Sequence, residues 1–229
     1  VDRDVINPSS RVITLANRMI VTAIPSFGGS VAPGDVVSLL GLTIQNTYTS
    51  DRRLSSLTVT HDSQGLSPAE LDGEIEILGL FADDGDGLFQ GQGVDILLGT
   101  EAFSGSKATF TGFGVDVILP AGGTQDFFVG ALVSTDQARD GDVLSALLEG
   151  PLDLSFDLPS TVAADWPVSS QSAWMVDGMV AAQIAVQGGG VATLGPGDGP
   201  VLAFDFVIPR NGYEDDELGG ISVRNQGDA

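Results

Sequence analysis

Residues 36–59 read VVSLLGLTIQNTYTSDRRLSSLTV, two apolar runs separated by a polar stretch. The first run, 36–44, is dense in Val, Leu and Ile, and the second, 54–61, mixes apolar residues with Ser and Thr. Runs of this length, bounded by Asn, Asp and Ser, are typical of β-strands. The stretch therefore predicts two consecutive strands joined by a polar turn.

The same pattern recurs along the whole chain. Further apolar runs lie at 11–15, 19–24, 74–82, 94–99, 108–113, 115–123, 127–135, 152–158, 179–186 and 201–209, separated by Gly, Pro, Asp and Ser. Only 67–73 and 143–150 favour a helix, and both are too short to change the class. The regular spacing of short runs predicts an all-β protein built as a β-sandwich.

Composition excludes several classes of function. The chain has 229 residues, 42% of them hydrophobic, which is enough for one large core or two smaller ones. It carries 31 acidic and 9 basic residues, a net charge of −22, so nucleic acid and anionic membranes are not expected partners. Cysteine is absent, which excludes disulfides and thiolate metal sites. No apolar run is long enough to predict membrane insertion.

An internal repeat is the most informative feature of the sequence. Residues 9–32 align with 169–192 at an offset of 160, and both copies contain SS and GG-x-VA. The motif PGD at 33–35 then aligns with PGD at 196–198. Residues 37–59 align with 201–223 at an offset of 164, with apolar positions preserved. Self-similarity of this kind indicates one structural unit used more than once.

The repeat divides the chain into four predicted segments. Residues 1–35 are N-terminal strands and linker, equivalent to 161–199, and residues 36–165 are the main β-sandwich. Residues 166–199 are linker and strands, and 200–229 begin the next repeat or form an inter-subunit strand segment. The prediction is thus one complete repeat plus the start of a second. A partial sandwich has an open sheet edge, so we expect later repeats or another subunit to complete it.

The loop 81–95, FADDGDGLFQGQGVD, is the strongest candidate binding site. Asp oxygens at alternate positions with interposed glycines suit Ca²⁺. Asp84 and Asp86 are the expected ligands, and Asp83 and Asp95 are further candidates. A tight hairpin turn would use the same Asp-Gly pairs, and a catalytic carboxylate cluster is a third reading. The loop departs from an EF-hand, because Leu88 stands where a third carboxylate is expected.

Other residues give weaker signals. His61 is the only histidine, no G-x-S-x-G motif accompanies it, and we expect it on a strand surface. Residues 134–142, STDQARDGD, are expected to form a solvated loop rather than a second metal site. Trp166 and Trp174 are expected in core or interdomain packing, with a sugar platform as the alternative. No carboxylate pair is singled out as in a glycosidase, so we predict no enzymatic activity.

The motifs DDGDGLF, VDILLGTEAFSG and PAGGTQDFFVGALVSTD together resemble the Ig-like β-sandwich repeats of large bacterial surface and secreted proteins. The resemblance covers most of residues 36–165. It implies an Ig-like, Greek-key sandwich, an Asp/Gly calcium loop, and a role in a filament, surface layer, stalk or adhesin. It supplies no catalytic residues.

These observations lead to one expected function and one alternative. We expect an extracellular or cell-surface structural protein of bacterial type, which self-associates head to tail into a fibre, stalk or array and is stabilised by Ca²⁺. The alternative is a carbohydrate-binding or adhesin module of a larger secreted protein, with a glycan as its partner.

Overall fold

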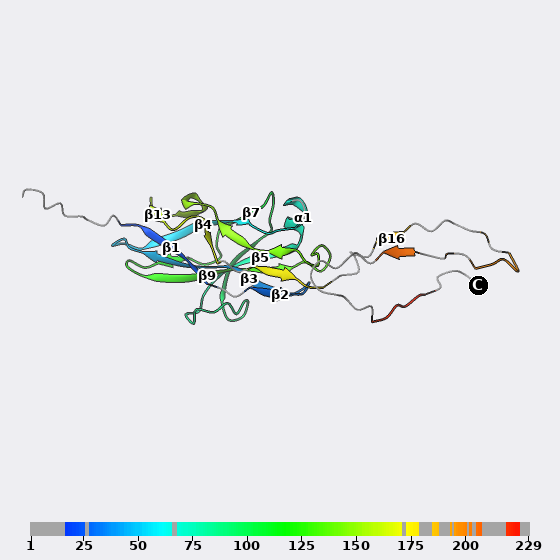
Figure 1. Ribbon diagram of the computed structural model, residues 1–229. Helices are drawn as coiled ribbons and strands as arrows, with labels where there is room; N and C mark the ends of the chain where they lie inside the picture. Colours follow the sequence, from blue (N-terminus) through cyan, green and yellow to red (C-terminus); the bar gives the residue numbers. More distant parts are fainter. Residues whose placement is uncertain are drawn as a thin grey trace, which may run out of the picture.

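The structure is a computed structural model that describes residues 17–25, 28–65, 68–170, 173–178, 185–187, 193, 195–200, 202, 205–207 and 219–224. The predicted all-β sandwich is confirmed, since strands make up almost all of the regular structure (Figure 1). Within the described residues, the exceptions are the short helix α1 (Pro68–Gly73) and a 3-10 turn (Pro151–Asp153). Helix α1 has six residues, too few to cross a membrane.

The first sheet has six strands with β3 and β9 at its centre. Its order is β13 (Val162–Ala163), β1 (Met19–Ile24), β3 (Val36–Asn46), β9 (Thr124–Val133), β5 (Ile75–Ala82) and β6 (Ile96–Glu101). All neighbours are antiparallel except β13 and β1, which run parallel. Strand β13 pairs only with Met19 and Ile20, at the start of β1.

A second sheet is built around β4 and faces the same core. It contains β12 (Leu154–Phe156), β4 (Arg52–His61), β11 (Ala146–Leu148) and β14 (Val168–Ser169), with β7 (Lys107–Thr111) and β8 (Ile118–Leu119) also paired to β4. A smaller sheet has the order β10 (Val143–Leu144), β15 (Trp174–Val176) and β2 (Gly29–Val31). Strands β15 and β2 run parallel.

Burial explains the sequence patterns of the two runs at 36–59. Residues 37–42 of β3 are all buried, as expected for a near-continuous apolar run in a strand covered on both faces. In β4 the buried Leu54, Leu57 and Val59 lie between more exposed residues such as Arg53 and Ser55, because only one face of this strand meets the core. Buried side chains from both sheets join in a single hydrophobic core.

The main sandwich extends beyond the predicted boundaries at residues 36 and 165. Strand β1 pairs along its whole length with β3, and β15 lies between β10 and β2. Strands β1, β2, β14 and β15 therefore belong to the same body as the strands between residues 36 and 165, and we call this body the first unit. The composition of Gly-rich segments predicted linkers there, but strand pairing with distant residues overrides that local signal.

The second copy of the repeat forms the same turn as the first. Asp35 and Asp198 each donate the backbone N–H to the carbonyl of the residue three positions earlier, at 3.1 Å in both copies. The carboxylate Oδ2 of each Asp accepts the backbone N–H of that same earlier residue. Gly34 and Gly197 both have φ of +90°, which glycine adopts readily. The PGD motif therefore has one conformation in both copies.

The second copy also forms an antiparallel strand pair, but not the one that β1 and β3 form. Strands β16 (Ala185–Gln187) and β17 (Asp205–Val207) are antiparallel. By the repeat, β17 is equivalent to residues 41–43 of β3, whereas β16 is equivalent to residues 25–27, which follow β1. The register differs, because Asp205 pairs with Gln187 rather than with residue 184, the equivalent of Ile24. Strands β16 and β17 form a two-stranded sheet of their own, and Figure 1 draws β16 apart from the sandwich. The predicted strand at 11–15 lies outside the described residues.

Candidate functional site

The acidic loop joins β5 to β6 and folds around its own carboxylates. Asp83 is buried, and its carboxylate accepts the backbone N–H of Gly85 at 2.9 Å and that of Gly87 at 3.1 Å. Asp84 accepts the N–H of Asp86, and Asp86 accepts the N–H of Leu88. Gly85 and Gly87 have φ of +113° and +76°, which suits the tight turns.

Three of the four predicted ligands come together. Asp83, Asp84 and Asp86 each offer a carboxylate oxygen, and these oxygens lie within 4.8 Å of one another. Hard oxygen donors at this separation could together hold a metal ion. The same carboxylates also cap backbone N–H groups, so the tight-turn reading and the metal reading describe one geometry. The loop can hold its shape by itself and can still present three anionic oxygens to a cation.

Asp95 lies outside this group and closes the other half of the loop. Its Oδ2 accepts the backbone N–H groups of Gln90 at 2.7 Å and Gly91 at 2.9 Å. The residue is 5% exposed, and its Oδ1 is buried with no hydrogen-bond partner in the described part of the chain. The structure therefore assigns Asp95 to loop closure and does not bring it to the three clustered carboxylates.

Phe89 fixes the loop to the first sheet. Its ring lies 5.4 Å from that of Phe81 and 5.9 Å from that of Phe128. Gly79 and Gly130 are paired across β5 and β9 beneath these rings, and a Cβ on Gly130 would lie 2.5 Å from Phe89. Aromatic packing of this kind gives the loop a rigid base, since two glycines leave room for the rings.

His61 is buried, which corrects the prediction of a strand-surface histidine. Its side chain is 2% exposed and stacks on Phe103, with ring centroids 4.4 Å apart. Nε2 lies 2.6 Å from Ser63 Oγ, and Nδ1 lies 3.6 Å from Asp72 Oδ1. Burial lowers the pKa of His61, although the charge and hydrogen bond of Asp72 and the charge of Asp62 oppose this. A neutral imidazole protonated at Nδ1 would accept a hydrogen bond from Ser63 Oγ at Nε2 and direct Nδ1–H toward Asp72.

This serine, histidine and aspartate set is one that the sequence did not reveal, because Asp72 comes from α1 and no motif marks the pairing. Ser63 Oγ also accepts the backbone N–H of Ser145 at 3.0 Å, and Ser145 Oγ donates to the Asp62 carbonyl at 2.8 Å. The hydroxyl of Ser63 is thus engaged in joining the end of β4 to the segment before β11. The arrangement stabilises the contact between these two segments of the chain.

The sequence predicted a solvated loop at 134–142, but one of its carboxylates packs against other residues. The Asp142 carboxylate packs on Gly65, where a Cβ would lie 2.4 Å from Asp142 Cγ. It also faces Glu74, which is 1% exposed. Burial first, and then the hydrogen bond and charge of Asp142, raise the pKa of Glu74 to about 9. Two carboxyl groups that are distant in the sequence meet here, and Asp142 disfavours ionisation of the buried Glu74.

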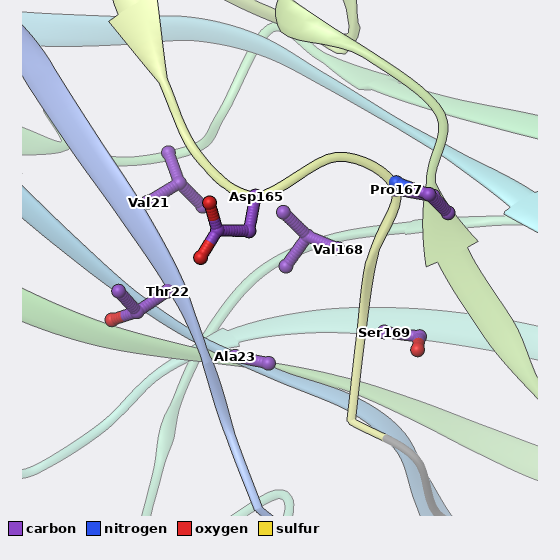
Figure 2. Close-up of a pocket in the computed structure, with 7 residues that line it drawn as sticks. All are labelled: Val21, Thr22, Ala23, Asp165, Pro167, Val168 and Ser169. Atoms are coloured by element: carbon purple, nitrogen blue, oxygen red, sulfur yellow. The ribbon is translucent and has the colours of Figure 1, made fainter.

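A small cavity of about 270 Å³ lies between β1 and residues 165–169 (Figure 2). Its lining is mostly apolar and small, and Asp165 is its charged member. The residues are Val21, Thr22, Ala23, Asp165, Pro167, Val168 and Ser169. The adjacent Trp166 is half-buried and packs against the core, as does Trp174, whose Nε1 donates to the Ser38 carbonyl at 2.8 Å. Both tryptophans take the packing role that was expected.

Comparison with known proteins gives no family for this chain. No family model matches it, and no curated protein matches it. Among solved structures, it is similar to AvmM, described as catalysing macrocyclization in alchivemycin A biosynthesis, at 12% identity and a TM-score of 0.34, over 72% of this chain and 91% of that one. It is also similar to the PapD-like domain 7 of human CEP192, at 10% identity and a TM-score of 0.27, over 74% and 94% of the two chains. Similarities this low carry no argument about function.

Proposed function

We propose that this is a structural protein of the cell exterior, built from β-sandwich units that follow one another head to tail. The observation that carries the proposal is the second copy of the PGD turn, with strand β17 at positions equivalent to β3, outside the first unit. A single complete binding module would have no need of a second opening turn and strand. The strong negative charge and the lack of cysteine agree with an extracellular array.

The second unit needs further strands. In the first unit, β3 lies between β1 and β9, whereas β17, its equivalent, pairs among the described strands with β16 alone. Apolar side chains of this region are exposed: Leu202 at 68%, Val207 at 47%, Ile221 at 58% and Val223 at 67%. A two-stranded hairpin is at best marginally stable in water, and an open edge accepts another strand readily. The added strand comes from a following repeat or from another subunit.

Sedimentation of the 229-residue chain over a range of concentrations tests whether another subunit supplies the added strand. We expect association that grows with concentration and is lost in Phe206→Pro, because proline removes a backbone N–H from β17. Leu152→Ser is the matched control, since Leu152 is 95% exposed on the first unit and lies outside the hairpin. This control separates strand addition from general hydrophobic association.

The denatured mass of the natural polypeptide tests whether a following repeat supplies the added strand. A mass well above 23.5 kDa is expected if covalent repeats complete the second unit. A mass near 23.5 kDa, together with a monomer at every concentration, would contradict both forms of the proposal.

Calcium binding at Asp83, Asp84 and Asp86 is part of the proposal. A cation there would tie the loop between β5 and β6 and would offset the repulsion between three neighbouring carboxylates. The alternative function, glycan recognition, gains no support from the tryptophans, since both pack on the core and one donates its N–H to the backbone.

A further inference from the structure

Glu74, which is buried, and Asp142, which is half-buried, bring two carboxyl groups together in the first unit. Glu74 precedes β5 and Asp142 precedes β10, so two distant parts of the chain contribute to the pair. Three of its oxygens, Oε1 and Oε2 of Glu74 and Oδ2 of Asp142, are buried and receive no hydrogen bond of ordinary geometry from the described residues. The absence of a side chain at Gly65 makes room for the Asp142 carboxylate.

Glu74 and Asp142 do not both carry a negative charge at neutral pH. Arg139 opposes the rise in the pKa of Glu74 through its charge and its backbone N–H. Its guanidinium, however, lies 3.6 Å from Glu70 of α1, and both of these side chains are about half exposed. Asp142 is the other charged group that acts on Glu74, and it raises the pKa. Glu74 therefore keeps its proton at neutral pH, beside the Asp142 carboxyl group.

The loop that carries Asp142 also anchors the strand by which the chain leaves the first unit. The Val176 N–H donates to the Asp142 carbonyl, and the Gly141 N–H donates to the Val176 carbonyl, at 2.9 and 2.8 Å. The Gly178 N–H donates to Asp140 Oδ1 at 3.0 Å. By the repeat, residues 169–178 already belong to the second copy. The junction between the units thus rests on residues 140–142.

We propose that the proton shared by Glu74 and Asp142 locks this junction, and that its removal releases β15 from residues 140–142. With the proton lost, two carboxylates face each other in the interior, and the loop can separate them only by moving outward. Outward movement breaks the hydrogen bonds to Val176 and Gly178. The lock acts within the first unit and does not depend on how the second unit is completed.

Amide hydrogen exchange of the full chain tests the lock. Protection factors, the intrinsic exchange rates divided by the observed rates, are compared for Val176 and Gly178 from about pH 6 to about pH 8. If opening returns Glu74 to its ordinary pKa, protection falls about tenfold for each pH unit. Glu74→Gln keeps a donor for Asp142 and should show no fall. Glu76→Gln, an exposed neighbour on β5, is the matched control and should behave as the unmodified chain.

Three results would overturn the proposal. One is protection at Val176 and Gly178 that does not change with pH, and another is an equal fall in Glu74→Gln. The third is protection equal to that of Leu42 in β3 at every pH, which would mean global unfolding and no local lock. If Glu74→Gln fails to fold, the Glu74 carboxyl carbon is titrated by NMR in the unmodified chain. We expect the signal of the Glu74 carboxyl carbon to titrate near pH 9, together with the amide signals of Val176 and Gly178. Titration of the Glu74 carbon near pH 4.5 would refute the shared proton.

Discussion

Strand β3 of the first unit and strand β17 of the second copy start from equivalent sequence and meet different surroundings. Each pairs antiparallel with a strand that precedes the PGD turn of its copy, β3 with β1 and β17 with β16. In the first unit β9 covers the free edge of β3 and the core covers its face, whereas β17 pairs among the described strands only with β16. Local sequence is thus enough for the turn and the pair, and burial depends on distant strands.

One position records this difference in the sequence. Gly41 is buried in β3, and a Cβ there would lie 2.9 Å from Ile24 Cβ and 3.2 Å from the Phe128 ring. The equivalent residue of β17 is Asp205, which is exposed. A strand placed beside β17 as β9 is placed beside β3 must therefore leave room for a carboxylate. The second unit cannot be an exact copy of the first.

Exchanging these two residues should give the largest effect. Gly41→Asp puts a charged side chain against Phe128 in the core, and we expect it to lower the free energy of unfolding by at least about 3 kcal/mol. Asp205→Gly should leave the first unit unchanged. Urea unfolding followed by tryptophan fluorescence measures both, since Trp166 and Trp174 pack on the first unit. Equal effects of the two substitutions would remove the distinction between the regions.

A second matched pair compares Leu42 with its equivalent Phe206. Leu42 is fully buried, so Leu42→Ala should lower the free energy of unfolding by about 2–5 kcal/mol. Phe206→Ala should change the unfolding of the first unit by less than about 0.5 kcal/mol. Calorimetry at a concentration where the chain is monomeric is the measurement. A large effect at Phe206 would mean that the hairpin and the sandwich unfold together.

Much of the fold could be predicted because its signals are local. The run at 19–24 is β1 residue for residue, and the PGD motifs mark the turns. The domain boundaries could not be predicted, since they depend on β1 pairing with β3 and on β15 lying between β10 and β2. The Asp83, Asp84 and Asp86 cluster follows from spacing within one loop. The partners of His61 and Glu74 do not, because α1 and residues 140–142 reach them only in the folded chain.

Calcium should act on the first unit alone, since the acidic loop belongs to it. At a Ca²⁺ concentration ten times the Kd, binding stabilises the folded state by about 1.4 kcal/mol. We expect Tm to fall on chelation, and the fall to vanish in the double variant Asp84→Asn, Asp86→Asn. Glu101→Gln, which removes an exposed charge on β6, is the control that should still respond. If chelation does not change the Tm of the unmodified chain, the loop is a tight turn and not a calcium site.

The smallest effect concerns His61, whose position at the same offset in the second copy holds Asn225. Burial lowers the pKa of His61 below 6.5, so below that pH the unfolded chain takes up a proton that the folded chain does not. The contribution of His61 to the free energy of unfolding should then be constant above pH 6.5 and fall by up to about 1.4 kcal/mol per pH unit below it.

Urea midpoints of the unmodified chain and of His61→Asn at about pH 7.5 and about pH 5.5 measure this contribution, since the opposite contribution of Glu74 is common to both chains. Ser63→Ala should keep the His61 contribution because the imidazole stays buried. An equal change of midpoint with pH in the unmodified chain and in His61→Asn would mean that His61 does not contribute.

The two parallel strand pairs, β1 with β13 and β2 with β15, have a mechanical consequence. In each pair one strand lies near the point where the chain enters the first unit and the other near the point where it leaves. A pull along the polypeptide draws two parallel neighbours in opposite directions along their length. The load is then borne in shear by all the hydrogen bonds of a pair at once, and the strands cannot be peeled apart one bond at a time. This geometry suits a protein that carries tension along its polypeptide chain.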